Sequence, residues 1–590
     1  MEDFFNYRRR KSSIVNIGNT PLGGDNPIRI QSMANVSTMD TDAAVCQAIR
    51  MIEAGAEYVR FTAQGEREAR NLGVIRKQLS EAGYTTPLVA DIHFNPRAAD
   101  AAAEEVEKVR INPGNYVDKV KTFDLQEYTD EEYAAELQKI RDRFIPFLNI
   151  CKAHGTAIRI GVNHGSLSDR IMSRYGDTPE GMVASCMEFL RICRDENFPD
   201  VVISIKASNT VVMVKTVRLL VRTMEAEDMY YPLHLGVTEA GDGEDGRIKS
   251  AVGIGALLSD GIGDTIRVSL SEDPEAEIPV ARKLVDYILE REGHEPVEAS
   301  PAPGYDPVTA DRRHSRVAER IGGNFPPVVI SDRSNGDFEF DHASQPDYIY
   351  IGKEDPENLP DNFRLLVDAH YPFFIASEID ELKDYSVPLK FIRLTYRDLT
   401  DRVIEVLKQD KSVIVILSTH HRNGIAAERA AMHHLLAAGC DVPVILHRDY
   451  RETDIEALQL KAAVDFGTLL LDGFGDGIML HNEGCETMVT DSCMFGILQA
   501  TRTRISKTEY ISCPSCGRTL YDLQTTIARI KKATSHLKGL KIGIMGCIVN
   551  GPGEMADADY GYVGAGKNRI SLYKGKECVL KNIPEEEAVE

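Results

Sequence analysis

The fold is decided by a strand–helix–strand stretch: Ala157-Ile-Arg-Ile-Gly-Val-Asn-His164, a helical pattern over Pro179–Asn197, then Val201-Val-Ile-Ser-Ile-Lys-Ala207. Both outer runs are rich in β-branched and apolar residues, as expected of strands that are buried on both faces. A helix that connects two such strands forms a βαβ unit, in which the strands are parallel. The stretch therefore predicts an α/β fold.

The same alternation continues on both sides of this stretch. Further strand-like runs occur at Ile28–Met33, Tyr58–Thr62, Leu88–His93, Val109–Asn112, Leu233–Thr238 and Thr265–Leu270. Further helical patterns lie at Asp42–Ala54, Glu66–Glu81, Glu131–His154 and Asn209–Glu225. Eight strands that alternate with helices over about 290 residues predict an N-terminal (β/α)8 TIM barrel.

A Pro- and Gly-rich linker, Gly293–Gly304, separates this barrel from a second alternating run. Strands are expected there at Pro327–Ser331, Tyr348–Gly352, Phe373–Ser377, Phe391–Thr395, Val413–Leu417, Val442–Leu446 and Thr468–Leu471. A closing helix is expected at Asp491–Arg504. We expect three domains: the first barrel over 1–295, an inserted barrel-like α/β domain over 305–503 that acts as a structural spacer, and a C-terminal α/β domain over 504–590.

A local repeat links the two alternating runs. The segment Asp260–Ser269 matches Asp472–His481 through a shared D-G-x-G-D pattern. The alternative is a generic turn, because this pattern is common in turns. Met479 stands in the second copy where Arg267 stands in the first, so we expect the second barrel to have no active site of its own.

The composition excludes several classes of protein. The 590-residue chain has a net charge of −23, which disfavours general binding to nucleic acid. It has no apolar stretch of 18 residues, so no membrane span is expected. The Arg8–Lys11 run has no apolar region after it and is not a signal peptide. Together with eleven Cys in metal-type spacing, this predicts a cytoplasmic protein.

A cysteine motif near the C-terminus has the spacing of a metal site. Cys513-Pro-Ser-Cys516 is followed by Cys547-Ile-Val-Asn-Gly-Pro-Gly-Glu554. Three thiolates and a different fourth ligand suit a [4Fe–4S] cluster, and a carboxylate at Glu554 would leave one iron open to chemistry. The alternatives are a zinc ribbon, buried cysteines without metal, and Cys578 as the fourth ligand.

Basic residues stand where the barrel strands are expected to end. In a TIM barrel these positions face the active site. The residues that share this placement are Arg60, Arg110, Arg159, Lys206 and Arg267. Such a set suits an anion with several phosphoryl oxygens, although any single arginine could be paired with a neighbouring acid. Asp91 and His93 are candidates for acid–base work or hydrogen bonding, and His164 could be structural.

The two motifs together resemble the 4-hydroxy-3-methylbut-2-enyl diphosphate synthase family, the iron–sulfur enzymes of the non-mevalonate isoprenoid pathway. The resemblance rests on five motifs besides Cys547: Cys513–Cys516, Asn550–Glu554, Val162–Gly165, Arg110–Gly114 and Arg267–Ser269. It covers the first barrel and the C-terminal domain. The insert resembles that of the longer, three-domain form of plants and some bacteria, and the bacterial type is favoured.

The resemblance implies a reaction and a role for each site residue. The reaction is the reductive ring opening and dehydration of 2-C-methyl-D-erythritol 2,4-cyclodiphosphate, with electrons from a flavodoxin or ferredoxin. Cys513, Cys516, Cys547 and Glu554 would hold the [4Fe–4S] cluster, and Glu239 would transfer a proton. The implied substrate-binding residues are Arg60, Arg110, Arg159, Asn163, His164, Lys206, Arg267, Ser269 and Asn550.

Two other classes stay open at this point. A pterin- or corrinoid-type barrel enzyme shares the barrel pattern but leaves the cysteine motif unexplained. An electron-transfer or metal-storage protein leaves the basic strand ends unexplained. We also expect each chain to complete its own active site, because the insert separates barrel and cysteine motif by almost 200 residues.

Overall fold

The computed structural model describes residues 3–118, 127–341, 344–352, 364–365, 370–519, 521–548, 551–555 and 557–588, with only the backbone at 364–365, 552 and 554. The chain divides into two compact units. We call Arg9–Gly246, Ile262–Val285 and Lys507–Glu590 the barrel unit, and Met1–Arg8, Arg247–Gly261 and Asp286–Ser506 the insert unit.

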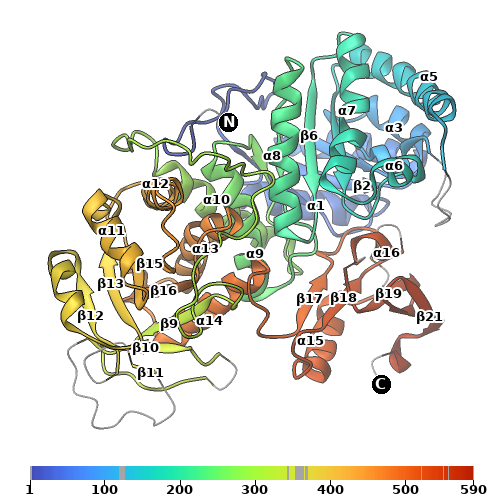
Figure 1. Ribbon diagram of the computed structural model, residues 1–590. Helices are drawn as coiled ribbons and strands as arrows, with labels where there is room; N and C mark the ends of the chain where they lie inside the picture. Colours follow the sequence, from blue (N-terminus) through green and yellow to red (C-terminus); the bar gives the residue numbers. More distant parts are fainter. Residues whose placement is uncertain are drawn as a thin grey trace. The chain divides into compact units, whose positions relative to one another are not determined.

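The barrel unit contains eight parallel strands in the order β6-β5-β4-β3-β2-β1-β8-β7 (Figure 1). They are β1 Arg29–Met33, β2 Tyr58–Ala63, β3 Leu88–Ile92, β4 Lys108–Ile111, β5 Ala157–Asn163, β6 Val201–Lys206, β7 His234–Leu235 and β8 Thr265–Ile266. A parallel bridge between Ile203 and Leu233 joins β6 to the chain before β7 and closes the ring. The predicted TIM barrel is confirmed, with β7 and β8 shorter than expected.

Helices follow the barrel strands as the alternation predicts. They are α1 Thr41–Glu53, α2 Glu66–Glu81, α3 Pro96–Ala103, α4 Pro113–Tyr116, α5 Asp130–His154, α6 Asp169–Tyr175, α7 Pro179–Asp195, α8 Thr210–Ala226, α9 Gly243–Ser259 and α10 Pro274–Leu289. Several begin at a side-chain cap: Asp40 accepts from the backbone N–H of Ala43, and Thr129 accepts from that of Glu132. In Figure 1, α7 and α8 lie beside β6 on the outside of the barrel.

An N-terminal hairpin closes one end of the barrel. Val15 and Leu22 form an antiparallel bridge and pack with Tyr58, Ala157 and Val202. These last three residues lie at the beginning of their strands, so the apolar core fills the N-terminal end of the barrel. The carboxyl ends of the strands are left to carry the polar side chains.

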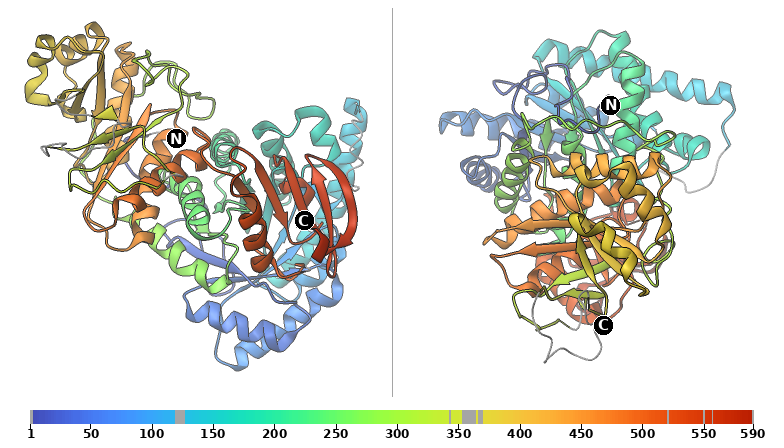
Figure 2. Two further views of the ribbon diagram at one scale, coloured as in Figure 1. Left: turned by 90° about the horizontal axis from the view of Figure 1, so that it is seen from below. Right: turned by 60° about the vertical axis from the view of Figure 1, so that its left-hand side comes forward.

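The C-terminal part of the barrel unit is a five-stranded sheet (Figure 2). Its strands are β17 Glu509–Ser512, β18 Lys541–Met545, β19 Tyr560–Gly566, β20 Arg569–Lys574 and β21 Glu577–Pro584, with helices α15 Leu523–Thr534, α16 Gly551–Glu554 and η3 Glu585–Glu587. Helix α15 packs on one face of the sheet through Leu523, Ile527 and Ile530. Ser512 bridges to Ala240, after β7, and the hydroxyl of Ser271, after β8, donates to the carbonyl of Cys513 at 2.9 Å. The chain after β17 is therefore attached to the carboxyl ends of the barrel strands.

The insert unit has a second sheet of eight parallel strands in the order β11-β10-β9-β16-β15-β14-β13-β12. They are β9 Val328–Asp332, β10 Tyr348–Tyr350, β11 Arg364–Leu365, β12 Phe373–Ile375, β13 Lys390–Leu394, β14 Val413–Leu417, β15 Val444–Tyr450 and β16 Gly477–Asn482. Its helices are η1 Ala376–Asp384, η2 Tyr396–Asp398, α11 Asp401–Gln409, α12 Gly424–Ala437, α13 Ile455–Leu471 and α14 Thr487–Ala500. The predicted barrel-like α/β fold is confirmed.

One predicted strand of the insert is wrong. Thr468–Leu471 is the last turn of α13, and the strand is β16, which begins at Gly477. This helix is buried over almost its whole second half, so its sequence is apolar on all sides. A continuous apolar run does not distinguish a buried helix from a buried strand.

The repeated D-G-x-G-D segments make equivalent contacts in the two units. Asp264 accepts from the Ser12 hydroxyl at 2.7 Å and from the backbone N–H of Leu233 at 2.9 Å. Asp476 accepts from the Ser315 hydroxyl at 2.7 Å and from the backbone N–H of Val444 at 2.9 Å. The sequence match is therefore a structural repeat rather than a generic turn.

Candidate active site

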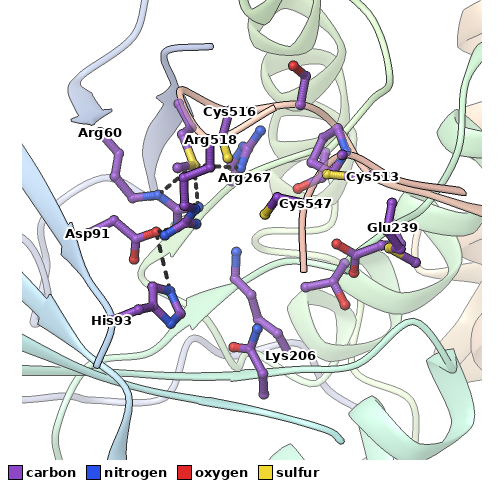
Figure 3. A pocket seen from close by; sticks show the side chains of 18 of the residues that line it. Arg60, Asp91, His93, Lys206, Glu239, Arg267, Cys513, Cys516, Arg518 and Cys547 are labelled. Atoms are coloured by element: carbon purple, nitrogen blue, oxygen red, sulfur yellow. Dashed lines mark hydrogen bonds and ion pairs between the residues drawn. The ribbon is translucent and has the colours of Figure 1, made fainter. Parts of the chain in front are cut away.

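A pocket in the barrel unit joins the strand ends to the cysteine motif (Figure 3). The residues that line it are Met33, Arg60, Asp91, His93, Arg110, Arg159, Asn163, Lys206, Thr238, Glu239, Arg267, Ser269, Cys513, Pro514, Ser515, Cys516, Arg518, Met545, Gly546, Cys547 and Gly551. All five basic residues predicted at strand ends are in this set. Residues more than 200 positions apart in the sequence thus meet in one cavity of one chain.

Two of the cations form no ion pair with an acid among the described residues. The guanidinium of Arg159 is 1% exposed, and its Nε and Nη1 have no hydrogen-bond partner among the described residues. Burial first, then the charges of Arg60 and Arg110, hold the pKa of Arg159 well below its usual range. Burial, with Arg60 and Arg159, does the same to the pKa of Lys206. An anion bound in the pocket would offset the free-energy cost of burying these two cations.

Arg60 is also poorly satisfied. Its Nε and Nη2 lie 3.0 and 2.6 Å from the Met33 sulfur, and a thioether is only a weak acceptor. Burial lowers the pKa of Arg60 to about 10 against the opposing effect of Asp91. Its guanidinium is therefore available to a stronger acceptor.

Arg110 is held in place by the strands around it. It donates to Asp91 Oδ1 at 3.0 Å, to the Gly161 carbonyl at 2.9 Å and to Asn163 Oδ1 at 2.9 Å. A Cβ at position 161 would lie 2.4 Å from Arg110 Nε, so only glycine lets the guanidinium cross β5 here. Burial alone would raise the pKa of Asp91, but Arg60 and Arg110 hold it well below its usual range.

His93 is a neutral hydrogen-bonding group in this pocket. Its Nε2 lies 2.5 Å from Arg110 Nη1, and its Nδ1 lies 3.3 Å from Asn115 Nδ2. Burial and the charge of Arg110 lower the pKa of His93 to about 3. The geometry supports hydrogen bonding more than transfer of a proton.

Arg267 has the structural partner that the sequence analysis allowed for. Its Nε and Nη2 donate to the two carboxylate oxygens of Glu277 at 3.0 and 2.9 Å. Glu277 is 2% exposed and also accepts from the Ser32 hydroxyl. Arg267 thus lines the pocket with its charge balanced.

Glu239 lies in the pocket on a strained backbone. It follows β7, is 4% exposed, and has a φ of 48°, which is uncommon for a residue with a side chain. Such strain persists only where the surrounding structure enforces it, and it gathers at functional sites. The backbone therefore supports the predicted functional role of Glu239.

Three thiols face the pocket from two turns. Cys513 and Cys516 follow β17, and Cys547 follows β18. Ser515, between the first two, has a φ of 68°. The described part of the chain holds no ready-made group of three His, Cys, Asp or Glu side chains at metal-binding distances.

The surroundings of the thiols nevertheless suit an iron–sulfur cluster. Arg267 and Arg518 line the pocket together with Cys513, Cys516 and Cys547. Thiolates are the ligands that iron–sulfur clusters require, and neighbouring cations stabilise their negative charge.

Of the remaining predicted residues, His164 and Cys578 lie outside the pocket lining, and Asn550 and Glu554 have no described side chain. His164 is not part of the lining; its Nε2 lies 3.6 Å from Asp177 Oδ1. Cys578 is exposed on β21 and is also absent from the lining, which disfavours it as a ligand. Asn550 and the side chain of Glu554 lie outside the described residues, so their placement stays a prediction.

One charged residue of the pocket, Arg518, was not predicted from the sequence. It lies two positions after Cys516, so its neighbourhood in the sequence was the available signal.

The fold and the site together define a class: a TIM-barrel oxidoreductase in which a thiol-bearing C-terminal segment meets a basic pocket at the strand ends. Comparison with known proteins agrees. Residues 12–282 match the family model described as "GcpE TIM-barrel domain", and residues 509–590 match "GcpE protein C-terminal domain".

Similar full-length proteins share one description, 4-hydroxy-3-methylbut-2-en-1-yl diphosphate synthase (flavodoxin). That of Parabacteroides distasonis is 84% identical over 100% of this chain and 97% of its own length. That of Phocaeicola vulgatus is 64% identical over 100% of this chain and 97% of its own length. That of Chlorobaculum tepidum is 43% identical over 99% of this chain and 88% of its own length. The chain belongs to the 4-hydroxy-3-methylbut-2-enyl diphosphate synthase family, as the resemblance predicted, and the pterin-type and electron-carrier interpretations are set aside.

Proposed function

We propose that this chain converts 2-C-methyl-D-erythritol 2,4-cyclodiphosphate into 4-hydroxy-3-methylbut-2-enyl diphosphate by reductive ring opening with loss of water. The observation that carries the proposal is the placement of unbalanced cations, Arg159 and Lys206, in one pocket with three thiols. The first feature suits a diphosphate, and the second suits redox chemistry at a metal centre.

The basic residues would bind the substrate by its phosphoryl oxygens. Arg60, Arg159 and Lys206 are the available cations, and Arg110 and Arg267 would contribute from the positions that Asp91 and Glu277 hold them in. Asn163 and Ser269 add neutral hydrogen-bonding groups to the same wall. We retain His164 only as an indirect contributor, because it faces Asp177.

The cofactor would be a [4Fe–4S] cluster held by Cys513, Cys516 and Cys547, with Glu554 as the fourth ligand. Such a cluster supplies electrons one at a time and a Lewis-acidic iron. Glu239, buried against the same cavity, is the proposed proton donor for the hydroxyl that leaves as water. Asn550 would contact the substrate from the cluster side.

We further propose the organisation of the molecule around this site. Residues 1–295 form the substrate-binding barrel, 305–503 the spacer and 504–590 the cluster domain, and each chain completes its own site. The strand ends of the insert support the spacer role, because their buried cations are paired with acids: Arg333 with Asp491 and Arg448 with Asp465. The electron donor would be a flavodoxin, named in the relatives' description, or a ferredoxin, in a reducing cytoplasm.

No helix in the described ranges is long and apolar enough to cross a lipid bilayer. The proposed substrate-binding surface is the pocket that Lys206 and the three thiols line.

Anaerobic turnover of the cyclic diphosphate with a chemical reductant tests the proposal. Wild-type protein should be brown, bleach on reduction and release the linear diphosphate. Cys547→Ser should lose iron, Lys206→Ala should keep iron but lose affinity, and Glu239→Gln should bind substrate and fail in turnover. A colourless wild-type protein, or one that leaves the cyclic diphosphate unchanged, would refute it.

A further inference from the structure

Arg518 is a buried cation of the pocket that the roles above do not use. Its side chain is 8% exposed, and its Nη2 lies 3.5 Å from Asp91 Oδ2. It lines the same pocket as Cys516 and Cys547. The guanidinium therefore stands between the thiols and an acid of β3 (Figure 3).

Asp91 is shared by two arginines from different parts of the chain. Its Oδ1 accepts from Arg110, on β4, and its Oδ2 faces Arg518, on the thiol-bearing turn. One carboxylate thus links the anion-binding wall to the turn that carries Cys516.

The turn is closely seated on the barrel at this point. A Cβ at Gly517 would lie 2.7 Å from the carbonyl oxygen of Val36 and 2.8 Å from the hydroxyl of Thr62. At the other end of the turn, Ser271 holds the Cys513 carbonyl. Arg518 is the charged contact that holds the Cys516 end.

We propose that Arg518 is a positioning residue: it fixes the Cys516 turn against Asp91 and places a positive charge beside the thiol sulfurs. This inference rests on the proposed function, because the second effect requires a cluster on these thiols. A cation beside a cluster stabilises the more negative, reduced state and so raises the reduction potential. The tie to Asp91 acts separately, by limiting the motion of the turn.

Four variants of the full-length, anaerobically purified protein separate the two effects. Arg518→Gln removes both the positive charge and the contact with Asp91. Arg518→Lys keeps the charge but has one ammonium group in place of the planar guanidinium. Asp91→Asn weakens the contact but keeps the arginine. Arg529→Gln is the matched control, because it removes an exposed arginine from α15 of the same C-terminal segment. Iron content and circular dichroism establish that each variant is folded and loaded.

The readouts are the reduction potential, from a redox titration followed by electron paramagnetic resonance, and amide hydrogen exchange over residues 513–519. Arg518→Gln should have a more negative potential than wild type, whereas Arg518→Lys and Asp91→Asn should not. Exchange should be faster by about tenfold in Arg518→Gln and Asp91→Asn, the effect of losing one charge-assisted hydrogen bond. Arg529→Gln should change neither.

Each possible outcome either supports or refutes the positioning role of Arg518. If Arg518→Gln has the wild-type potential, or exchange over 513–519 is unchanged in both Arg518→Gln and Asp91→Asn, the positioning role is refuted. If Arg518→Gln does not load iron, Asp91→Asn decides in its place: faster exchange over 513–519 than in wild type supports the positioning role, and wild-type exchange refutes it. A wild-type protein without an iron–sulfur signal would contradict the proposed function itself, whereas a normal signal with no shift in Arg518→Gln contradicts only this inference.

Discussion

Individual residues of the pocket differ most in whether their charge is balanced. Arg267 forms an ion pair with Glu277 and Arg110 with Asp91, whereas Arg159 and Lys206 form none with the described side chains. A buried cation without an ion pair costs free energy in the empty protein, so two of them in one pocket support the proposed role in binding an anion.

This difference predicts opposite effects of two arginine substitutions. Arg159→Ala should weaken binding of the cyclic diphosphate about ten- to a hundredfold, since a charged hydrogen bond contributes roughly 1.5–3 kcal/mol, yet leave thermal stability unchanged or raised. Arg267→Ala should destabilise the fold by about 3–5 kcal/mol, because it leaves Glu277 buried without its partner. Calorimetric titration and thermal unfolding measure both. Equal loss of stability in the two variants would contradict the distinction.

Substrate affinity should depend on pH through Lys206. Burial, with Arg60 and Arg159, holds its pKa low in the empty protein, and a bound diphosphate would raise it. Below the pKa of the empty protein, the amine is charged in both states and contributes no pH dependence. Between that pKa and the pKa of the complex, binding takes up a proton, so affinity falls as pH rises.

Calorimetry in buffers of different ionisation enthalpy measures this proton uptake. Wild-type protein should take up protons on binding, and Lys206→Met should take up fewer. Proton release by the wild type, or the same uptake in both proteins, would contradict the low pKa of Lys206.

At the scale of the element, the strands of the first barrel follow from the sequence. Apolar, β-branched runs bounded by polar residues correctly predicted β1 to β6, because parallel strands are buried on both faces. The short helix α3 was not predicted, and Thr468–Leu471 was misassigned because a buried helix and a buried strand have similar composition. The basic residues at the strand ends were predictable as well, because each of them lies on a strand that the apolar pattern predicts.

Glycine 161 shows how an element supports the site without touching substrate. An added methyl group there would meet the flexible end of Arg110, not the backbone. Gly161→Ala should therefore keep the fold of β5 and displace the guanidinium, lowering substrate affinity by about tenfold. Gly65→Ala is the control, because its nearest neighbour is a carboxylate oxygen of Glu68 at 3.9 Å. Wild-type affinity in Gly161→Ala would contradict the role of the close contact.

At the scale of the whole chain, the sequence could not show which residues meet. The spacing of Cys513, Cys516 and Cys547 predicted a metal site, but only the structure places these thiols in the cavity of Lys206. Hydrophobic periodicity specifies elements and their buried faces, whereas the docking of a distant segment depends on a few specific contacts such as Ser271 with Cys513. Arg518 was missed for this reason.

The central claim is that one chain supplies both the anion-binding mouth and the thiols of its active site. The direct test mixes Cys516→Ser with Lys206→Ala under conditions that allow any oligomer to exchange subunits, at a substrate concentration too low for Lys206→Ala alone to turn over. Sites completed within one chain predict no recovery of turnover, because every chain carries one lesion. Recovery to as much as about a quarter of wild-type activity, the value for random pairing in a symmetric dimer with shared sites, would contradict the claim.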